Sequence, residues 1–193
     1  MPDVFDVLGK DHDEVKAMLT RLEEGPRHAG GSVPGPLAER KRRVDELIIE
    51  ESRHEAAEQQ YFWPAVRALG PDGERIADEA IGQETLGERV LDKLEKLNPE
   101  DYQQFEELLA AFTSAARAHI AFEEAHAWPL LRASISADQS EALGAKIVAA
   151  KKTAPTRPHP HTPPTEEAQK SLGPVAGAAD RLRDTVTGRG KQR

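Results

Sequence analysis

Apolar residues recur at intervals of three and four along the first 135 positions, which is the spacing of amphipathic α-helices. The pattern predicts four long helices, over residues 3–24, 37–69, 74–97 and 99–133. No stretch shows the strict alternation of apolar and polar residues that marks a strand. Turn sequences such as Gly70-Pro71 separate the helices. The expected fold is therefore all-α, an antiparallel up-down-up-down four-helix bundle.

The sequence changes character after the predicted bundle. Residues 1–135 form the expected bundle domain, and residues 136–150 predict a short extra helix. Residues 151–193 are rich in proline and carry nine Lys and Arg against four Asp and Glu, a net charge of +5 in a chain whose net charge is −8. We expect this basic tail to be largely disordered, with a weak amphipathic helix over residues 175–186. A protein partner could contact the tail, and its composition does not identify one.

The composition also excludes several classes of protein. The chain has no cysteine, so disulfides and thiolate metal sites are ruled out. No run approaches the ~20 apolar residues that span a bilayer, and the first residues lack the features of a signal peptide, so a cytoplasmic location without membrane contact is expected. There is no glycine-rich phosphate loop and no basic patch interleaved with aromatic residues. Nucleic acid is therefore not an expected partner.

A His-x-x-x-Glu motif occurs twice, 65 residues apart, and each copy is followed by a Trp-Pro pair and an arginine. The matching pairs are His54 and His119, Glu58 and Glu123, Trp63 and Trp128, Pro64 and Pro129, and Arg67 and Arg132. Residues four apart lie one helical turn apart on the same face, so each motif places an imidazole beside a carboxylate. Two copies that face each other in a bundle would form a two-metal pocket. The prolines, which lie inside the helical pattern, predict kinks or new helical segments.

Each predicted helix carries at least one ionisable residue on its apolar stripe, near the middle of its length. These six residues are His12, His54, Glu58, Glu84, His119 and Glu123. Burying such groups without partners costs several kcal/mol each, which together exceeds the whole stability of a domain, about 5–15 kcal/mol. Two divalent cations would compensate, because three carboxylates carry −3 against +4, and a bridging oxo or hydroxo group would bring the balance close to neutral. Nitrogen and oxygen donors without sulfur suit iron, manganese or zinc.

The order of these residues resembles that of the hemerythrin-like HHE cation-binding family. The resemblance rests on the upstream histidine, the doubled His-x-x-x-Glu motif and the aromatic-Pro pair after each copy, and it covers residues 1–135. It implies a non-haem site with two iron ions that binds oxygen or related diatomic molecules. The implied ligands are His12 and His54 on one ion, His119 and a third-helix residue on the other, and Glu58 and Glu123 as bridges.

The sequence departs from the family pattern on the third helix. The family usually has a histidine there, but residues 73–97 contain none. Extending the apolar stripe places Glu84 at this position, with Gln83 and Glu88 as neighbouring alternatives. In the same way, Glu124 adjoins Glu123 and is an alternative bridge.

Six protein ligands do not saturate two metals, so with Glu58 and Glu123 as bridges the pocket keeps open positions for a small ligand such as O2, NO or peroxide. A third carboxylate in place of an imidazole favours the oxidised metal pair and works against reversible O2 carriage. We therefore expect oxidase or peroxide-decomposing chemistry. The main alternative is a non-catalytic iron-responsive sensor or storage protein that signals through its tail, and a third reading is a helical interaction domain without metal. These readings differ in whether the protein is an enzyme.

Overall fold

The protein is helical in every regular element that the structure describes. The computed structural model describes residues 2–25, 34–98 and 101–189, and it contains no strand in these ranges. The all-α expectation is therefore confirmed, and the architecture is that of a hemerythrin-like helical bundle. Across the same ranges, no helix is both long enough and apolar enough to cross a membrane. The cytoplasmic location stays a prediction.

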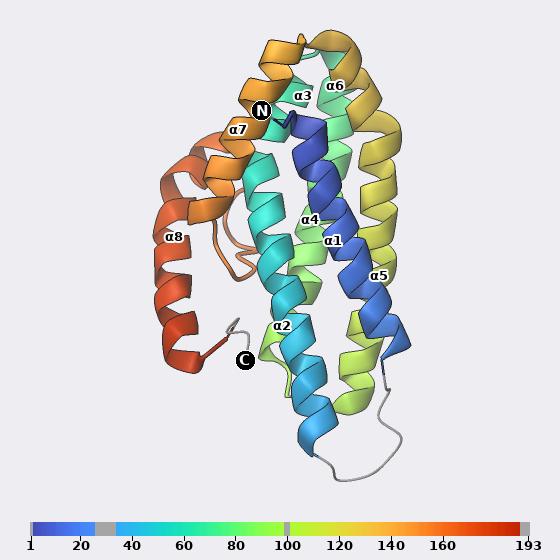
Figure 1. Cartoon of the computed structure of the whole chain (residues 1–193), viewed down its shortest axis with the longest axis vertical. Coiled ribbons are helices and arrows are strands. Elements are labelled where there is room, and N and C mark those ends of the chain that lie inside the picture. The colour runs from blue at the N-terminus through green and yellow to red at the C-terminus, as the bar shows by residue number, and fades with distance from the viewer. Residues whose placement is uncertain (1, 26–33, 99–100, 190–193) are drawn as a thin grey trace.

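Four long helices lie side by side along the longest axis of the molecule (Figure 1). They are α1 (Val4–Glu24), α2 (Pro34–Ala57), α4 (Pro71–Lys96) and α5 (Tyr102–Phe122). Helix α1 packs against α2, and α4 packs against α5. The start of α1 is fixed by a capping box, in which the Asp3 side chain accepts from the Asp6 N–H at 2.8 Å and the Asp6 side chain accepts from the Asp3 N–H at 3.3 Å.

A π-helical turn begins at the glutamate of each His-x-x-x-Glu motif. These turns are η1 (Glu58–Phe62) and η2 (Glu123–Ala127), and they lead into α3 (Trp63–Arg67) and α6 (Trp128–Ser134). The backbone N–H of Trp63 donates to the Glu58 carbonyl, five residues back, and the backbone N–H of Trp128 donates in the same way to the Glu123 carbonyl. A proline follows each tryptophan, and its ring would crowd the carbonyl four residues back in a regular helix. The wider π turn relieves this crowding, so the helix continues through the proline.

The apolar core forms two clusters that are separated along the bundle. One cluster contains Leu8, Ala57, Trp63, Ala80 and Leu131 among others, and the second contains Val15, Ile48, Leu91, Phe105 and Ile120 among others. On α1, α2 and α4, His12, His54 and Glu84 fall between members of the first cluster and members of the second, and His119 on α5 lies at the edge of the second cluster, beside Ile120. The fold therefore places a polar layer at mid-height of an otherwise apolar interior.

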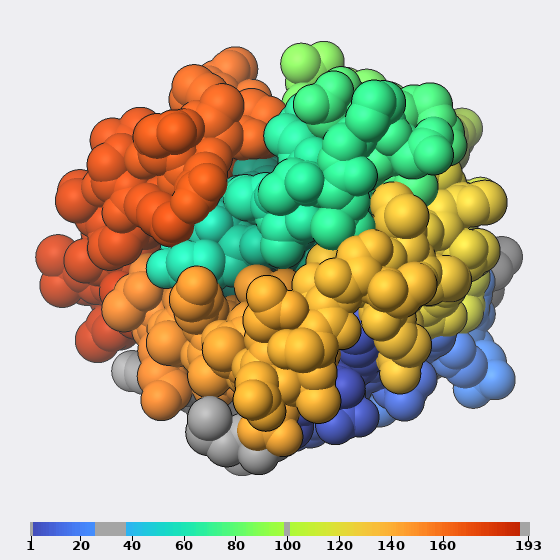
Figure 2. Space-filling model, turned by 90° about the horizontal axis from the view of Figure 1, so that it is seen from above, coloured from blue at the N-terminus to red at the C-terminus, as the bar shows by residue number. Residues whose placement is uncertain are grey.

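Two further helices pack on the outside of the bundle. Helix α7 (Ala137–Thr153) begins at a Ser136 capping box and packs on α1 and α2. Helix α8 (Glu166–Thr187) packs on α7 and η1. Seen from above, α7 and α8 lie on one side of the molecule, and the segment after η1 lies beside them at the surface (Figure 2).

The expectation of a largely disordered tail over residues 151–193 is not confirmed. Helix α8 is capped by Thr165 at its start and by Gly188, at φ 73°, at its end. The segment before it is held by polar contacts, because the Thr156 hydroxyl donates to Asp184 at 2.6 Å and the buried Arg157 pairs with both Glu95 and Asp184. These contacts are ionic and polar, so a prediction of disorder that is based on low apolar content could not reveal them. Residues 190–193 lie outside the described residues.

Candidate metal centre

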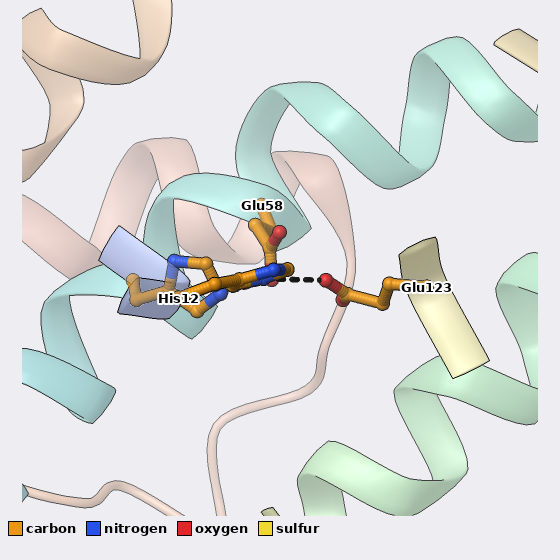
Figure 3. A group of neighbouring side chains, drawn as sticks. His12, Glu58 and Glu123 are labelled. Carbon is orange, nitrogen blue, oxygen red and sulfur yellow. Dashed lines mark ion pairs between the residues drawn. The ribbon is translucent and has the colours of Figure 1, made fainter. Parts of the chain in front are cut away.

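The structure brings all six predicted residues together in the polar layer. His12 comes from α1, His54 from the end of α2, Glu84 from α4 and His119 from α5, while Glu58 and Glu123 open η1 and η2. Five of the six are buried, with exposed fractions of 0–4%, and the side chain of His119 is 12% exposed. In Figure 3, Glu58 and Glu123 converge on His12 from different helices.

The six side chains form two groups that share two members. One group contains His12, His54, Glu58 and Glu123, and the other contains Glu58, Glu84, His119 and Glu123. Within each group, one donor atom per residue lies within 4.8 Å of the others. Glu58 and Glu123 belong to both groups, which is the arrangement of two adjacent cation positions bridged by two carboxylates.

Seven of the ligand atoms in these groups have no hydrogen-bond partner. Both oxygens of Glu58 and of Glu123 are buried without one, and so are Nε2 of His12, His54 and His119. They approach one another closely, at 2.9 Å from His12 Nε2 to Glu123 Oε2, 3.2 Å from His54 Nε2 to Glu58 Oε2 and 3.1 Å from His119 Nε2 to Glu123 Oε1. Buried polar atoms are normally hydrogen-bonded, so seven orphaned atoms at one level need a common partner. A pair of cations fits this donor set of imidazoles and carboxylates.

Electrostatics in the layer also favour a bound cation. Burial raises the pKa of Glu84 to about 8 and that of Glu58 well above its usual value, and nearby carboxylates raise the pKa of Glu58 further. Burial opposes the charge on His119, but the Glu123 carboxylate outweighs it and raises the pKa of His119 to about 9. For Glu123, burial is outweighed by His119 and His12, which hold the pKa of that carboxyl below its usual range. Without metal, the layer keeps protons that a divalent ion would displace.

Each histidine is oriented by a second polar contact on its far side. His12 Nδ1 lies 3.0 Å from Glu124 Oε1, and this carboxylate also accepts from Lys16 Nζ at 2.7 Å. His54 Nδ1 forms an ion-pair contact with Asp11 Oδ2 at 3.5 Å, without a hydrogen bond, and the other oxygen of Asp11 is 2.6 Å from Lys151 Nζ. Such carboxylate partners fix the ring orientation of a metal-binding histidine.

The ring of His119 has its own polar contact on the far side, and the ring of His12 has a further contact with an aromatic side chain. Nδ1 of His119 lies 3.0 Å from Gln83 Oε1. The ring of His12 stacks on Trp128, with 5.1 Å between the ring centroids and 13° between the planes. The tryptophan of the second motif copy therefore supports a candidate ligand.

The structure separates the alternatives that the sequence left on the third helix. Glu84 lies in the layer, and its carboxylate accepts from Gln59 Nε2 at 2.7 Å and from Trp63 Nε1. Gln83 instead faces the far side of His119. Glu88 lies beside the segment before α8, near His159. Among the described residues, Glu88 belongs to no group of His, Asp and Glu side chains that could hold a metal.

Glu124, the alternative bridge, lies on the outer side of His12 and not between the two groups. Sequence reasoning therefore placed the inner residues but missed their outer partners, Asp11, Lys16, Gln59, Trp63 and Lys151. One signal was available for Trp63, because it belongs to the doubled motif. The other four come from positions with no motif.

A cavity of about 310 Å³ adjoins the layer. His12, His54, Glu84 and His119 line it together with apolar residues of α4 and α5, such as Phe112. Two buried carboxyls, Glu51 and Glu55, also face it. A cavity of this size admits a molecule of a few atoms to the imidazoles while its apolar wall limits water.

Comparison with known proteins decides the family. The family model of the hemerythrin HHE cation binding domain matches residues 3–138. The chain belongs to this family. The match covers α1 to α6, and therefore all six residues of the polar layer. The protein is thus a hemerythrin-like HHE cation-binding domain with a cluster of His and Glu side chains that could bind metal.

Two relatives extend the likeness beyond the family match. An uncharacterized hemerythrin-like protein of Schizosaccharomyces pombe is 23% identical over 187 residues, which cover 96% of this chain and 87% of the relative. The crystal structure of a hemerythrin HHE cation binding domain-containing protein of Mycobacterium kansasii matches with a TM-score of 0.62 and 23% identity, over 79% of this chain and 86% of that one. The second likeness supports the fold.

Proposed function

We propose that this hemerythrin-like protein holds two iron ions in the polar layer and that the pair binds O2, NO or peroxide. In this proposal His12 and His54 hold one ion, Glu84 and His119 hold the other, and Glu58 and Glu123 bridge them. The observation that supports it is the set of seven orphaned buried donor atoms, arranged in two groups that share both glutamates. Manganese or zinc would fit the same donors.

The residues of the chain have three tasks in this proposal. The two His-x-x-x-Glu motifs provide imidazole and carboxylate donors at fixed spacing. Glu124 and Asp11 orient two of the imidazoles. The apolar wall of the cavity, including Phe112 and Ile120, restricts water near the donors.

When bound, a pair of redox-active ions supplies electrons and a polarising charge to a small ligand. Six protein donors do not saturate two such ions, which leaves room for a ligand from the cavity. Three carboxylates against three imidazoles favour the oxidised pair, so we propose oxidase or peroxide-decomposing activity in preference to reversible O2 carriage. The topology that goes with this proposal is the antiparallel up-down-up-down bundle, in a cytoplasmic protein.

A second candidate is a non-catalytic iron-responsive sensor or storage protein that signals through its C-terminal segment. One contact favours it, because α8 packs directly on η1, the turn that begins with Glu58. In this case the state of the metal would change how α8 docks.

Metal content and the optical spectrum test the first candidate. Purified protein loaded with Fe(II) and then exposed to air should contain two iron ions per chain. It should also show a near-ultraviolet charge-transfer band that shifts when azide or peroxide is added. Protein that binds no iron and whose melting temperature does not change with Fe(II) would refute the metal centre. A stable, reversible oxygenated spectrum would refute the proposed preference for oxidative chemistry.

A further inference from the structure

Helix α8 reaches the polar layer through a chain of amide side chains. Gln169 Nε2, on α8, donates to Gln59 Oε1 at 2.6 Å, and Gln59 Nε2 donates to Glu84 Oε2 at 2.7 Å. All three side chains are buried. A helix outside the region of the family match is therefore linked by two hydrogen bonds to a candidate metal ligand.

The chain of hydrogen bonds has a defined direction. An amide offers one donor group and one acceptor, so Gln59 can accept from Gln169 only with its oxygen and then presents its N–H to Glu84. The neighbouring Gln60 holds the same part of α8 from the other side, since its Nε2 donates to the Gln169 carbonyl at 3.1 Å. One turn later, Gly173 leaves room for this contact, because a Cβ there would lie 3.2 Å from Gln60 Nε2.

The two oxygens of Glu84 are held by different elements. Gln59 holds Oε2 from η1, and the Trp63 indole N–H holds Oε1 from α3. These donors stabilise the ionised carboxylate and fix its rotation, while each oxygen keeps a second lone pair for a cation. Without Gln59 the carboxylate would lose one of its two anchors and could turn away from His119, which lies 3.8 Å from Oε1.

We propose that Gln59 and Gln169 are positioning residues for Glu84, so that α8 helps to hold a candidate metal ligand in place. This inference rests on the proposed function, because it concerns the ion held by Glu84 and His119. This relay, from Gln169 through Gln59 to Glu84, acts on that ion and not on the one held by His12 and His54, since among the described residues its hydrogen bonds lead to Glu84 and to no histidine.

The relay also works in the opposite direction. If docking of α8 strengthens metal binding at Glu84, then metal binding must strengthen docking of α8 by the same factor. Bound metal should therefore protect the segment before α8 and α8 itself from proteolysis. Equal cleavage of the apo protein and the loaded protein in this segment would therefore contradict the coupling.

The test is a cobalt(II) titration of the full chain without oxygen, in which the two binding events are resolved by calorimetry and by the visible spectrum. The variants are Gln59→Leu, Gln169→Leu and the double variant. We expect Gln169→Leu to weaken one of the two binding events about 10-fold and Gln59→Leu to weaken the same event by up to about 100-fold, which is the range for partners of metal ligands. The double variant should equal Gln59→Leu alone, because both residues act through one chain of bonds.

The matched control is Thr156→Val. It also removes one buried hydrogen bond that docks α8, at 2.6 Å to Asp184, but at the far end of the helix from Gln169. It should leave both binding events unchanged. If Gln169 only helps to dock α8, Thr156→Val and Gln169→Leu should change metal binding to the same extent, or the effects of Gln59→Leu and Gln169→Leu should be additive. Either result would overturn the relay.

Two further outcomes are distinguishable. If the wild-type chain binds no cobalt, the proposed metal centre fails and the relay fails with it. If the wild type binds two ions and Gln169→Leu binds them equally well, only the relay fails. Should either glutamine variant not fold, proteolysis of the wild type decides, because cleavage of residues 155–189 at the same rate with and without cobalt contradicts the coupling.

Discussion

Glu58 and Glu123 occupy equivalent positions, because each is the first residue of a π-helical turn. The backbone carbonyl of each glutamate accepts from the backbone N–H of a tryptophan five residues later. Both belong to each of the two groups in the polar layer, and neither has a hydrogen-bond partner for its oxygens. The two copies of the motif therefore share the same backbone geometry as well as the same residues. π turns occur often at functional sites, and here they begin at the two candidate bridging residues.

The orphaned carboxyl of Glu58 should reduce the stability of the metal-free protein. Replacing it by methionine removes a buried polar group without a partner and keeps an unbranched side chain. We expect Glu58→Met to raise the free energy of unfolding of the metal-free protein by about 1–3 kcal/mol and to abolish the binding of two ions. Urea unfolding in the presence of a chelator measures the first effect, and metal analysis measures the second.

The control for this prediction is Glu79→Met on the exposed side of α4, which should change the free energy of unfolding by less than about 0.5 kcal/mol. A metal-free Glu58→Met protein that is less stable than the wild type would show that the carboxyl has a partner within the protein.

The metal-free protein should lose stability as the pH rises from about 4.5 to 9. The pKa of Glu84 is raised to about 8 by burial, so its protonated form stabilises the fold below the ordinary value of 4.5, and this contribution is lost as the pH passes 8. The raised pKa of His119, about 9, acts in the same direction between 6.5 and 9. Thermal unfolding at several pH values, with and without metal, tests this.

The metal-loaded protein should behave differently over the same pH range. A cation replaces the protons, so metal affinity should rise with pH and binding should release protons into the buffer. Melting temperatures that change equally with pH in the two forms would contradict the assignment of Glu84 and His119 to the centre.

The inner layer could be predicted from the sequence because its residues interrupt an apolar stripe. His12 and Glu84 stand where the helical spacing demands aliphatic side chains, so the pattern that predicts the helix also places them in its interior. The repeat then relates the remaining four residues to each other. The level at which they meet follows from helix length alone.

The outer partners could not be predicted in the same way. Asp11, Gln59 and Lys151 are polar residues at positions where a helix normally faces solvent. Their contacts depend on how α7 and α8 rotate against the bundle, which is a matter of packing between distant segments. No periodicity within one helix contains this information.

In helix α8, the apolar pattern predicts the helix but does not identify the face that packs on the rest of the protein. Its apolar side chains Leu172, Val175, Leu182 and Val186 are 50–81% exposed. The face that docks consists of small and polar residues, namely Gln169, Gly173, Gly177, Asp180 and Asp184. The helical spacing of the apolar residues is thus genuine, while the contact with the bundle is made by the opposite side.

Asp11 should matter for metal binding although it is not a candidate ligand. Its carboxylate lies between His54 Nδ1, at 3.5 Å, and Lys151 Nζ, at 2.6 Å. Asp11→Asn removes the charge that orients the imidazole, so we expect metal affinity to fall about 10- to 100-fold. Competition with a coloured chelator measures this affinity. The exposed neighbour Asp13 provides the control, and equal affinities for Asp11→Asn and Asp13→Asn would remove Asp11 from the centre.

Docking of α8 should depend on the absence of a side chain at Gly177. A Cβ at this position would lie 2.2 Å from the Thr153 carbonyl oxygen and 2.7 Å from that of Ala154, which are backbone atoms that cannot move alone. Gly177→Ala should therefore displace α8 from α7 while the bundle keeps its two apolar clusters. Limited proteolysis followed by intact-mass measurement should show cleavage within residues 155–189 at least ~10-fold faster than in the wild type, corresponding to about 1.4 kcal/mol of docking.

The matched substitution is Gly82→Ala in α4, where a Cβ would meet nothing within 4 Å. Alanine is favoured over glycine inside a helix by about 0.5–1 kcal/mol, so this variant should be more stable than the wild type and equally resistant to proteases. The two alanine variants differ only in what surrounds the new methyl group. If both are cleaved as slowly as the wild type, α8 does not dock through Gly177, and the amide chain from Gln169 to Glu84 loses its structural support.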